Sequence, residues 1–248
     1  MSVPDQPQPT PAAPPARRIP WRVRYPGQSA RAVAFYKFIQ FLSRTAFTLI
    51  YRLRVFGLDN IPASGACIIV CNHNSHLDPP AVGGLPSRRA IHFVAKAELF
   101  KSRAFGGFIR ALNSIPIKQD GSADIESIRE ILARLNSGAA VLLFPEGTRS
   151  PSHEMLPLQR GIGLLVKRAK CPVIPAAIVG SREAWPPGQK LPSLWGRTIA
   201  IRFGAPIPPE ELTGPDALDR LKREILAQRA ELFAMRSTPG SAPLAHSA

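Results

Sequence analysis

The chain has 248 residues, of which 45% are apolar, so it can bury a substantial core, and one domain is the simplest arrangement for this length. Its formal net charge of +15 indicates an anionic partner, either nucleic acid or the phospholipid face of a membrane. Because no zinc-finger spacing, RNP-like block or other nucleic-acid module is visible, we expect no nucleic acid and favour an anionic membrane surface.

The two ends of the chain have compositions that are typical of disordered segments. Residues 1–30 are rich in Pro, Ala and Gln and become basic around Trp21, and residues 236–248 are rich in Ser, Pro, Gly and Ala. Such segments bury too little surface to stay folded on their own. We therefore expect a disordered basic tail over residues 1–30 and a second disordered tail over residues 236–248.

Residues 31–50 form an apolar segment in which polar side chains recur at spacings of three and four. These spacings place the polar side chains on one stripe of a helix and leave a wide apolar face. The apolar face comprises Phe35, Phe38, Ile39, Leu42, Ala46, Leu49 and Ile50. Because Lys37 and Arg44 interrupt it, we expect an amphipathic helix at the membrane interface and not a spanning helix. The alternative is that the same face packs on the protein's own core.

Between residues 51 and 235, segments typical of strands and helices mostly alternate. Apolar and β-branched runs predict strands near 51–58 and at 66–71, 91–95, 115–118, 140–144, 173–179 and 198–203. Periodic segments predict helices near 98–112, 123–136, 159–169 and 209–235. This alternation predicts an α/β fold for one catalytic domain over residues 51–235.

The strand predicted at 66–71 runs directly into residues 72–78, of sequence NHNSHLD. A neutral imidazole can take a proton near pH 7, and a carboxylate can fix its tautomer and stabilise the imidazolium. We therefore predict that His73 is a catalytic base and that a tight turn brings Asp78 back onto it. His76 leaves an alternative open, since His73, His76 and Asp78 could together hold zinc.

The strand predicted at 140–144 runs into a second polar turn, of sequence PEGTRS. Ligands of open α/β sheets gather outside the carboxyl ends of the strands, so both turns are expected to face one crevice. Gly147 allows the backbone to approach a ligand closely, Thr148 adds a hydroxyl, and Arg149 offers a planar fork that suits a phosphate. The two turns together indicate a phosphorylated substrate.

These segments resemble four sequence blocks of the 1-acyl-glycerol-3-phosphate acyltransferases and their glycerolipid acyltransferase relatives. The first block, NHxSxxD, is matched by Asn72, His73, Ser75 and Asp78, and the third, FPEGTRS, is present unchanged at 144–150. The second usually ends in an apolar run and a basic residue, commonly Arg, and is similar to IPIK at 115–118. The fourth is similar to VIPA at 173–176. The resemblance covers roughly residues 50 to 210.

The resemblance implies a single mixed, largely parallel sheet flanked by helices. It also implies transfer of a fatty acyl group from acyl-ACP or acyl-CoA to the free sn-2 hydroxyl of 1-acyl-glycerol-3-phosphate, giving phosphatidic acid. His73 would take the proton of the hydroxyl while Asp78 orients the imidazole, and no cofactor or metal is implied. The substrate-binding residues implied are Glu146, Gly147, Thr148, Arg149, Lys118 and Lys96. Structural roles within the blocks are implied for Asn72, Ser75, Pro145 and Pro175.

Three alternatives stay open. The acceptor could be another lysolipid, such as lyso-ornithine lipid, because relatives with these blocks acylate different head groups. The chain could instead be a metal-dependent hydrolase or a non-enzymatic basic binder of membrane surfaces.

The sequence also bears on localisation. It has three cysteines without a metal-type spacing and shows no secretory leader. We therefore expect a peripheral or monotopic protein on the cytoplasmic face of the inner membrane.

Overall fold

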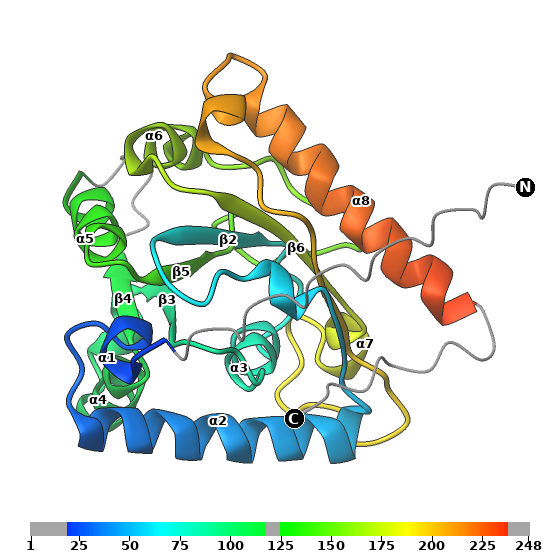
Figure 1. Ribbon diagram of the computed structural model, residues 1–248. Helices are drawn as coiled ribbons and strands as arrows, with labels where there is room; N and C mark the ends of the chain where they lie inside the picture. The colour runs from blue at the N-terminus through cyan, green and yellow to red at the C-terminus, as the bar shows by residue number, and fades with distance from the viewer. Residues whose placement is uncertain (1–18, 118–124, 238–248) are drawn as a thin grey trace, which may run out of the picture.

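The computed structural model describes residues 19–117 and 125–237, and its centre is a seven-stranded sheet (Figure 1). In chain order the strands are β1 (Arg54–Phe56), β2 (Cys67–Cys71), β3 (Ile91–Lys96), β4 (Ser114–Ile117), β5 (Ala140–Leu143), β6 (Val173–Val179) and β7 (Ala200–Phe203). Their order across the sheet is β1-β7-β6-β2-β5-β3-β4. Only β6 and β7 pair antiparallel. The prediction of a mixed, largely parallel sheet is therefore confirmed.

Helices cover both faces of this sheet. The α-helices are α1 (Trp21–Arg24), α2 (Ala30–Tyr51), α3 (Asp78–Gly83), α4 (Arg103–Ala111), α5 (Ile125–Asn136), α6 (Arg160–Ala169), α7 (Ser181–Ala184) and α8 (Ala217–Ser237). Three short 3-10 helices are η1 (Leu58–Asn60), η2 (Ala97–Phe100) and η3 (Pro209–Leu212). Helices α2, α3 and α7 pack on one face, whereas α5, α6 and α8 pack on the other.

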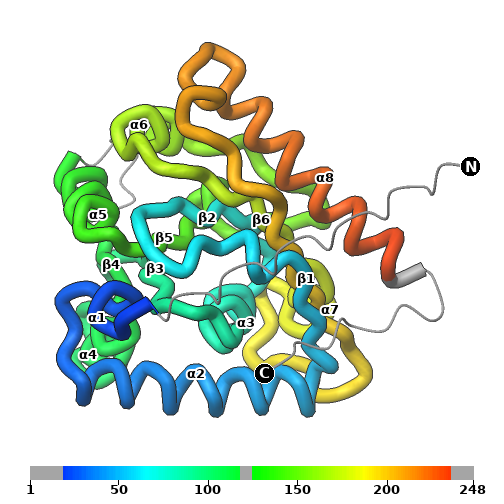
Figure 2. The backbone as a smooth tube through the Cα atoms, in the orientation of Figure 1, coloured from blue at the N-terminus to red at the C-terminus, as the bar shows by residue number. Residues whose placement is uncertain are grey.

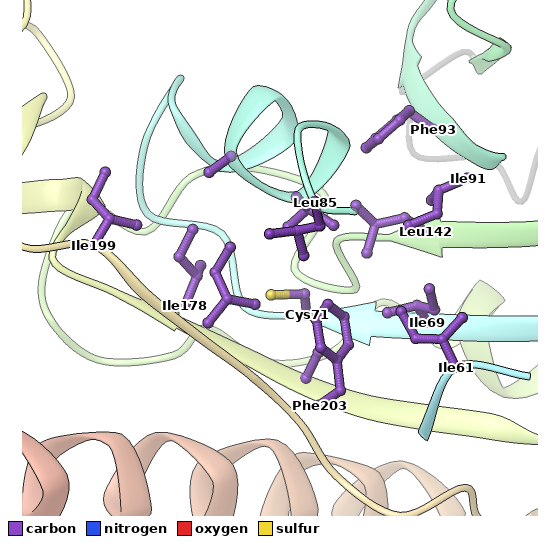
Figure 3. Close-up of a cluster of buried hydrophobic side chains, with 14 of the residues drawn as sticks. Ile61, Ile69, Cys71, Leu85, Ile91, Phe93, Leu142, Ile178, Ile199 and Phe203 are labelled. Carbon is purple, nitrogen blue, oxygen red and sulfur yellow. The ribbon is translucent and has the colours of Figure 1, made fainter. Parts of the chain in front are cut away.

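The central strands β2, β5 and β6 are buried along their whole length, as continuous apolar runs in a covered parallel sheet should be. Alternate residues of β2 point to opposite faces: Ile69 and Cys71 lie in the core beneath α2 and α3, and Val70 lies in the core beneath α5 and α6. Figure 3 shows part of the first core, where Cys71 packs with Leu85 and Phe203. The hydrophobic cores on the two faces of the sheet thus hold the carboxyl end of β2 in place.

Several predicted boundaries shift. Helix α2 continues to Tyr51, so the strand expected near 51–58 shrinks to β1 at the edge of the sheet (Figure 2). The helix expected near 98–112 divides into η2 and α4, because the Ser102 side chain accepts the N–H of Phe105 and starts a new helix there. The helix expected at 209–235 divides into η3 and α8 around Gly214, a residue that disfavours helix interiors.

The disordered tail expected over residues 1–30 is wrong for residues 19–30. Residues Trp21–Arg24 form helix α1, and the next residue, Tyr25, is buried. The Tyr25 ring lies edge-on to the ring of Tyr36 on α2, with 6.4 Å between the ring centroids. This one aromatic contact anchors a segment whose average composition predicts disorder. Residues 1–18 and 238–248 lie outside the described residues, and α8 runs through residue 237.

Helix α2 packs on the protein through Tyr36, Gln40, Phe47 and Tyr51 and turns a wide apolar face away from it. Gln40 is buried, and its Nε2 donates to the carbonyl of Leu85 at 2.6 Å. Lys37 Nζ donates to Gln40 Oε1 at 2.9 Å, and Ser43 Oγ donates to the carbonyl of Pro80 at 2.8 Å. The outward side chains Phe35, Phe38, Phe41, Leu42 and Leu49 are exposed. These five side chains do not pack on the protein's own core, whereas Ile50 of the predicted apolar face does.

Among residues 19–117 and 125–237, no helix combines the length and the apolar content that crossing a bilayer requires.

Candidate active site

The turn after β2 brings Asp78 onto His73, as the sequence predicts. His73 Nδ1 lies 2.8 Å from Asp78 Oδ2, and the same oxygen accepts the backbone N–H groups of Asn74 at 2.7 Å and Ser75 at 2.8 Å. An oxygen that accepts two backbone N–H groups acts as an acceptor toward Nδ1–H as well. This arrangement leaves Nε2 of His73 as the nitrogen that can accept a proton. The catalytic role of the pair stays a prediction.

The turns after β2 and β5 meet through backbone hydrogen bonds. The Ser150 N–H donates to the carbonyl of His73 at 2.9 Å, and the His73 N–H donates to Glu146 Oε1 at 2.7 Å. The imidazole of His73 stacks on the ring of Phe144, with 4.2 Å between centroids. The His73 side chain is 17% exposed, so its ring is held from below while one edge reaches the surface. The two turns therefore lie side by side at the carboxyl ends of β2 and β5, and a shared crevice between them stays a prediction.

Glu146 is buried, and both oxygens of its carboxylate bind backbone amides. Oε1 accepts from His73, and Oε2 accepts from the N–H of Leu156 at 2.8 Å. Burial raises the pKa of Glu146, while the hydrogen bonds from His73 and Leu156 act in the opposite direction. Glu146 therefore fixes the backbone beneath the imidazole. Its direct contact with a substrate stays a prediction.

Arg149 places a cation beside the imidazoles of this site. Its side chain is half-buried, and no described group pairs with its Nη1. The pKa of His76 is lowered, first by burial and then by the charge of Arg149 and by His73. Gly147 adopts φ +71°, a left-handed conformation that favours glycine, and Thr148 is exposed. The turn thus presents a guanidinium whose charge acts on His76, and an exposed hydroxyl.

Two residues of this site have no sequence signal. Arg182 on α7 donates from Nη1 to the carbonyl of Ser150 at 2.7 Å and from Nη2 to the carbonyl of Pro151, so it fixes the far end of the Arg149 turn. The carbonyl of Trp185 accepts the hydroxyl of Ser75 at 2.8 Å. Both lie more than 30 residues from their partners along the chain, and neither belongs to a recognisable motif.

The motif residues Asn72 and Ser75 point inward and join elements of the fold. Asn72 exchanges two hydrogen bonds with Ile178: its Nδ2 donates to the carbonyl at 3.0 Å, and its Oδ1 accepts the N–H at 2.8 Å. This exchange locks the end of β2 onto β6. The carbonyl of Pro145 accepts the N–H of Gln159, and that of Pro175 accepts the N–H of Gly204. These contacts support the structural roles that the resemblance implies.

Lys96, Lys118 and His76 are the remaining predicted residues. Lys96 is exposed at the end of β3, and Lys118 lies outside the described residues. His76 is exposed, and its ring lies 5.0 Å from that of Trp185. In the part of the chain that the structure describes, no group of three or more His, Cys, Asp or Glu side chains could hold a metal ion. The zinc alternative therefore has no ligand set there.

Comparison with known proteins gives consistent results. A family model described as Acyltransferase matches residues 52–179. The chain is 32% identical over 147 residues to the 1-acyl-sn-glycerol-3-phosphate acyltransferase of Bacillus subtilis, which covers 58% of this chain and 71% of that protein. It is 30% identical over 234 residues to the protein of the same name from Pseudomonas aeruginosa, covering 91% of this chain and 82% of that protein.

A solved structure has the same fold. The 1-acyl-sn-glycerophosphate acyltransferase of Thermotoga maritima superposes with a TM-score of 0.69 at 25% identity, covering 84% of this chain and 82% of that one. The chain also matches plant relatives, of which it spans 39% to 41% of the length.

Proposed function

Because the chain belongs to the acyltransferase family, we propose that it transfers a fatty acyl group to the free sn-2 hydroxyl of 1-acyl-glycerol-3-phosphate, giving phosphatidic acid. The observation that carries the proposal is the contact of 2.8 Å between His73 and Asp78 beside the cation of Arg149. The names of the curated relatives support the choice of acceptor.

In this mechanism His73 Nε2 removes the proton of the acceptor hydroxyl as its oxygen attacks the thioester carbonyl. A C–O bond forms, the C–S bond breaks, and the imidazolium returns the proton to the departing thiolate. Asp78 keeps Nδ1 protonated and stabilises the imidazolium between the two proton transfers. No covalent acyl-enzyme is required, because the acceptor oxygen is itself the nucleophile.

The acceptor's phosphate is bound by Arg149, whose planar fork can make two parallel hydrogen bonds to phosphate oxygens. Thr148 and Gly147 contribute a hydroxyl and a close backbone approach in the same turn. Lys96 and Lys118 add positive charge for the same phosphate. Holding the phosphate here brings the neighbouring hydroxyl within reach of His73, which converts binding energy into orientation.

The outward face of α2 rests in the interface of an anionic membrane, at its cytoplasmic side. Five large apolar side chains on that face are exposed: Phe35, Phe38, Phe41, Leu42 and Leu49. Exposed apolar faces of this kind mark membrane or protein contacts, and basic flanks such as those of Arg31 and Arg44 favour anionic lipid. Both substrates carry acyl chains, so docking at the leaflet brings the enzyme to them.

A panel of lysolipid acceptors, offered with both acyl-ACP and acyl-CoA to the purified protein and analysed by mass spectrometry, tests this proposal. We expect phosphatidic acid from 1-acyl-glycerol-3-phosphate as the main product. Preferential acylation of lyso-ornithine lipid would shift the proposal to that acceptor. Release of free fatty acid without any acylated lipid would contradict transferase activity.

A further inference from the structure

The loop of residues 186–198, which joins α7 to β7, exposes large apolar side chains that the catalytic site does not use. Leu191 is 78% exposed, Trp195 64% and Leu194 56%. No other large apolar side chain among residues 19–117 and 125–237 is as exposed as Leu191. Exposed cations, Lys190 and Arg197, flank the three. An indole and two leucines between two cations match the chemistry of a membrane interface.

Hydrogen bonds hold the first part of this loop against the end of α7. The Ser193 N–H donates to the carbonyl of Ala184 at 2.7 Å, and Trp185 Nε1 donates to the carbonyl of Gln189 at 2.9 Å. Trp195 adopts φ +71°, a left-handed conformation that bulky residues rarely adopt. Backbone strain of this kind is found preferentially at functional sites.

The loop reaches the same side of the molecule as helix α2. Figure 1 shows the loop, in yellow, beside the carboxyl end of α2, whereas α4 lies at the other end of the same helix. The loop's return to the sheet is joined to α2 by the N–H of Ile199, which donates to the carbonyl of Tyr51 at 2.9 Å. At the opposite end, Phe35 on α2 and the exposed Phe108 on α4 meet edge-on. Exposed apolar side chains thus occur on α2 and on the segments beside both of its ends.

The loop is also joined to the catalytic turn. It begins after Trp185, whose carbonyl accepts the hydroxyl of Ser75 and whose ring contacts that of His76. Both residues belong to the turn that carries His73. A surface that binds the loop therefore also sets the distance between that surface and His73.

We infer that the loop of residues 186–198 inserts Trp195, Leu191 and Leu194 into the interface of a phospholipid leaflet and so holds the His73 turn at the lipid surface. The inference rests on the proposed function, because the acceptor and the product are membrane lipids. A bilayer fits better than a protein groove, because Lys190 and Arg197 on either side of the apolar tip can bind anionic head groups while the indole lies at their level.

Fluorescence quenching tests the insertion directly. Wild-type protein and the Trp195→Phe variant are mixed with vesicles of phosphatidylcholine and phosphatidylglycerol whose acyl chains carry bromine, which quenches nearby indoles. The chain has three tryptophans, and we expect a large part of the wild-type quenching to be missing in Trp195→Phe. Equal fractional quenching of the two proteins would overturn the inference.

Enzyme assays separate membrane docking from chemistry. The triple variant Leu191→Ser, Leu194→Ser, Trp195→Ser should lose about tenfold or more in kcat/KM on lysophosphatidate in vesicles. The loss should be confined to that substrate and absent for a short-chain, monomeric lysophosphatidate. Leu226→Ser on α8, which changes an exposed leucine away from α2, is the matched control and should leave both activities unchanged. Equal losses on both substrates would overturn the inference, whereas an inactive wild type would contradict the proposed function instead.

Discussion

His73 and Asp78 are joined at 2.8 Å through an oxygen that two backbone N–H groups also bind. The carboxylate is fully buried, whereas the imidazole keeps 17% of its surface. The carboxylate of Asp78 is thus held within the protein, whereas the imidazole of His73 reaches the surface. The proposed role of His73, as a general base that takes the proton of a lipid hydroxyl, fits this arrangement.

Removing the imidazole should abolish proton transfer without loosening the fold. His73→Ala is expected to lower kcat by at least about 10², the range for loss of a general base. Because the two side chains act as a unit, His73→Ala with Asp78→Asn should be no slower than His73→Ala alone. Steady-state assays on the wild type and both variants measure this, with vesicle binding as the control. A double variant much slower than the single one would mean that Asp78 acts independently of His73.

Replacing the buried carboxylate beneath the site should affect both activity and stability. In Glu146→Gln the new amide nitrogen faces the N–H of either His73 or Leu156, which leaves that donor without a partner. An unsatisfied buried group costs about 1 to 3 kcal/mol in the free energy of unfolding. We expect kcat to fall as well, because the His73 backbone loses its support. Denaturant titration and kinetics on one preparation test this, and a variant with unchanged stability would contradict the bonding described here.

Arg149 should act on acceptor binding more than on turnover. A hydrogen bond to a charged group contributes about 1.5 to 3 kcal/mol, so Arg149→Ala is expected to raise KM for 1-acyl-glycerol-3-phosphate by about tenfold to hundredfold. Arg149→Lys should recover only part of the affinity, because an ammonium lacks the planar fork. The KM for the thioester should change little. An equal effect on both KM values would argue against a phosphate contact.

Arg182 should position the turn without touching substrate. Arg182→Met removes the donors to the carbonyls of Ser150 and Pro151, and Ser150 in turn bonds the backbone of His73. We expect kcat/KM to fall by about tenfold, in line with the loss of about 1.4 kcal/mol of transition-state orientation. Arg168→Met, at an exposed arginine of α6, serves as the control. If Arg182→Met behaves like that control, the hydrogen bonds from Arg182 to Ser150 and Pro151 have no catalytic consequence.

Acid should destabilise the protein through His92, which is buried and whose ring nitrogens have no partner. Burial, together with the charges of Arg134 and Arg89, lowers the pKa of His92 from 6.5 to about 4. The unfolded chain binds the proton more readily, so stability is complete above about pH 6.5 and falls as the pH drops toward 4. His92→Leu should reduce the stability lost between about pH 7 and about pH 4.5 by roughly 2 kcal/mol. Denaturant curves at both pH values measure the difference, and parallel losses in the two proteins would contradict it.

The residues at the strand ends could be predicted because their signals are local. The apolar runs of β2 and β5 stop at polar turns within two residues, and each turn carries its own chemistry. The contact between His73 and Asp78 spans five positions, which a single turn can close. The α/β fold followed from the alternation of strands and helices, whereas the largely parallel sheet was implied by the family resemblance.

Other parts of the site depend on distant contacts that no local pattern records. Glu146 reaches the amide of His73 across 73 positions, so its role beneath the imidazole was not visible in the turn itself. Arg182 and Trp185 likewise contact the site from more than 30 positions away along the chain, so no local pattern indicates their roles. The burial of Gln40 depends on the carbonyl of Leu85, 45 residues away. Antiparallel pairing of β6 with β7 likewise depends on how the exposed loop between them returns to the sheet.

The hydrogen bonds of Gln40 to Leu85 and of Ser43 to Pro80 hold α2 in an orientation that leaves Phe35, Phe38 and Phe41 in water. In lipid-free buffer, only a detergent or another copy of the chain can cover those rings. Purification without detergent should therefore yield assemblies that grow with concentration, and mild detergent should return single molecules. The need for detergent during purification thus follows from the orientation of α2.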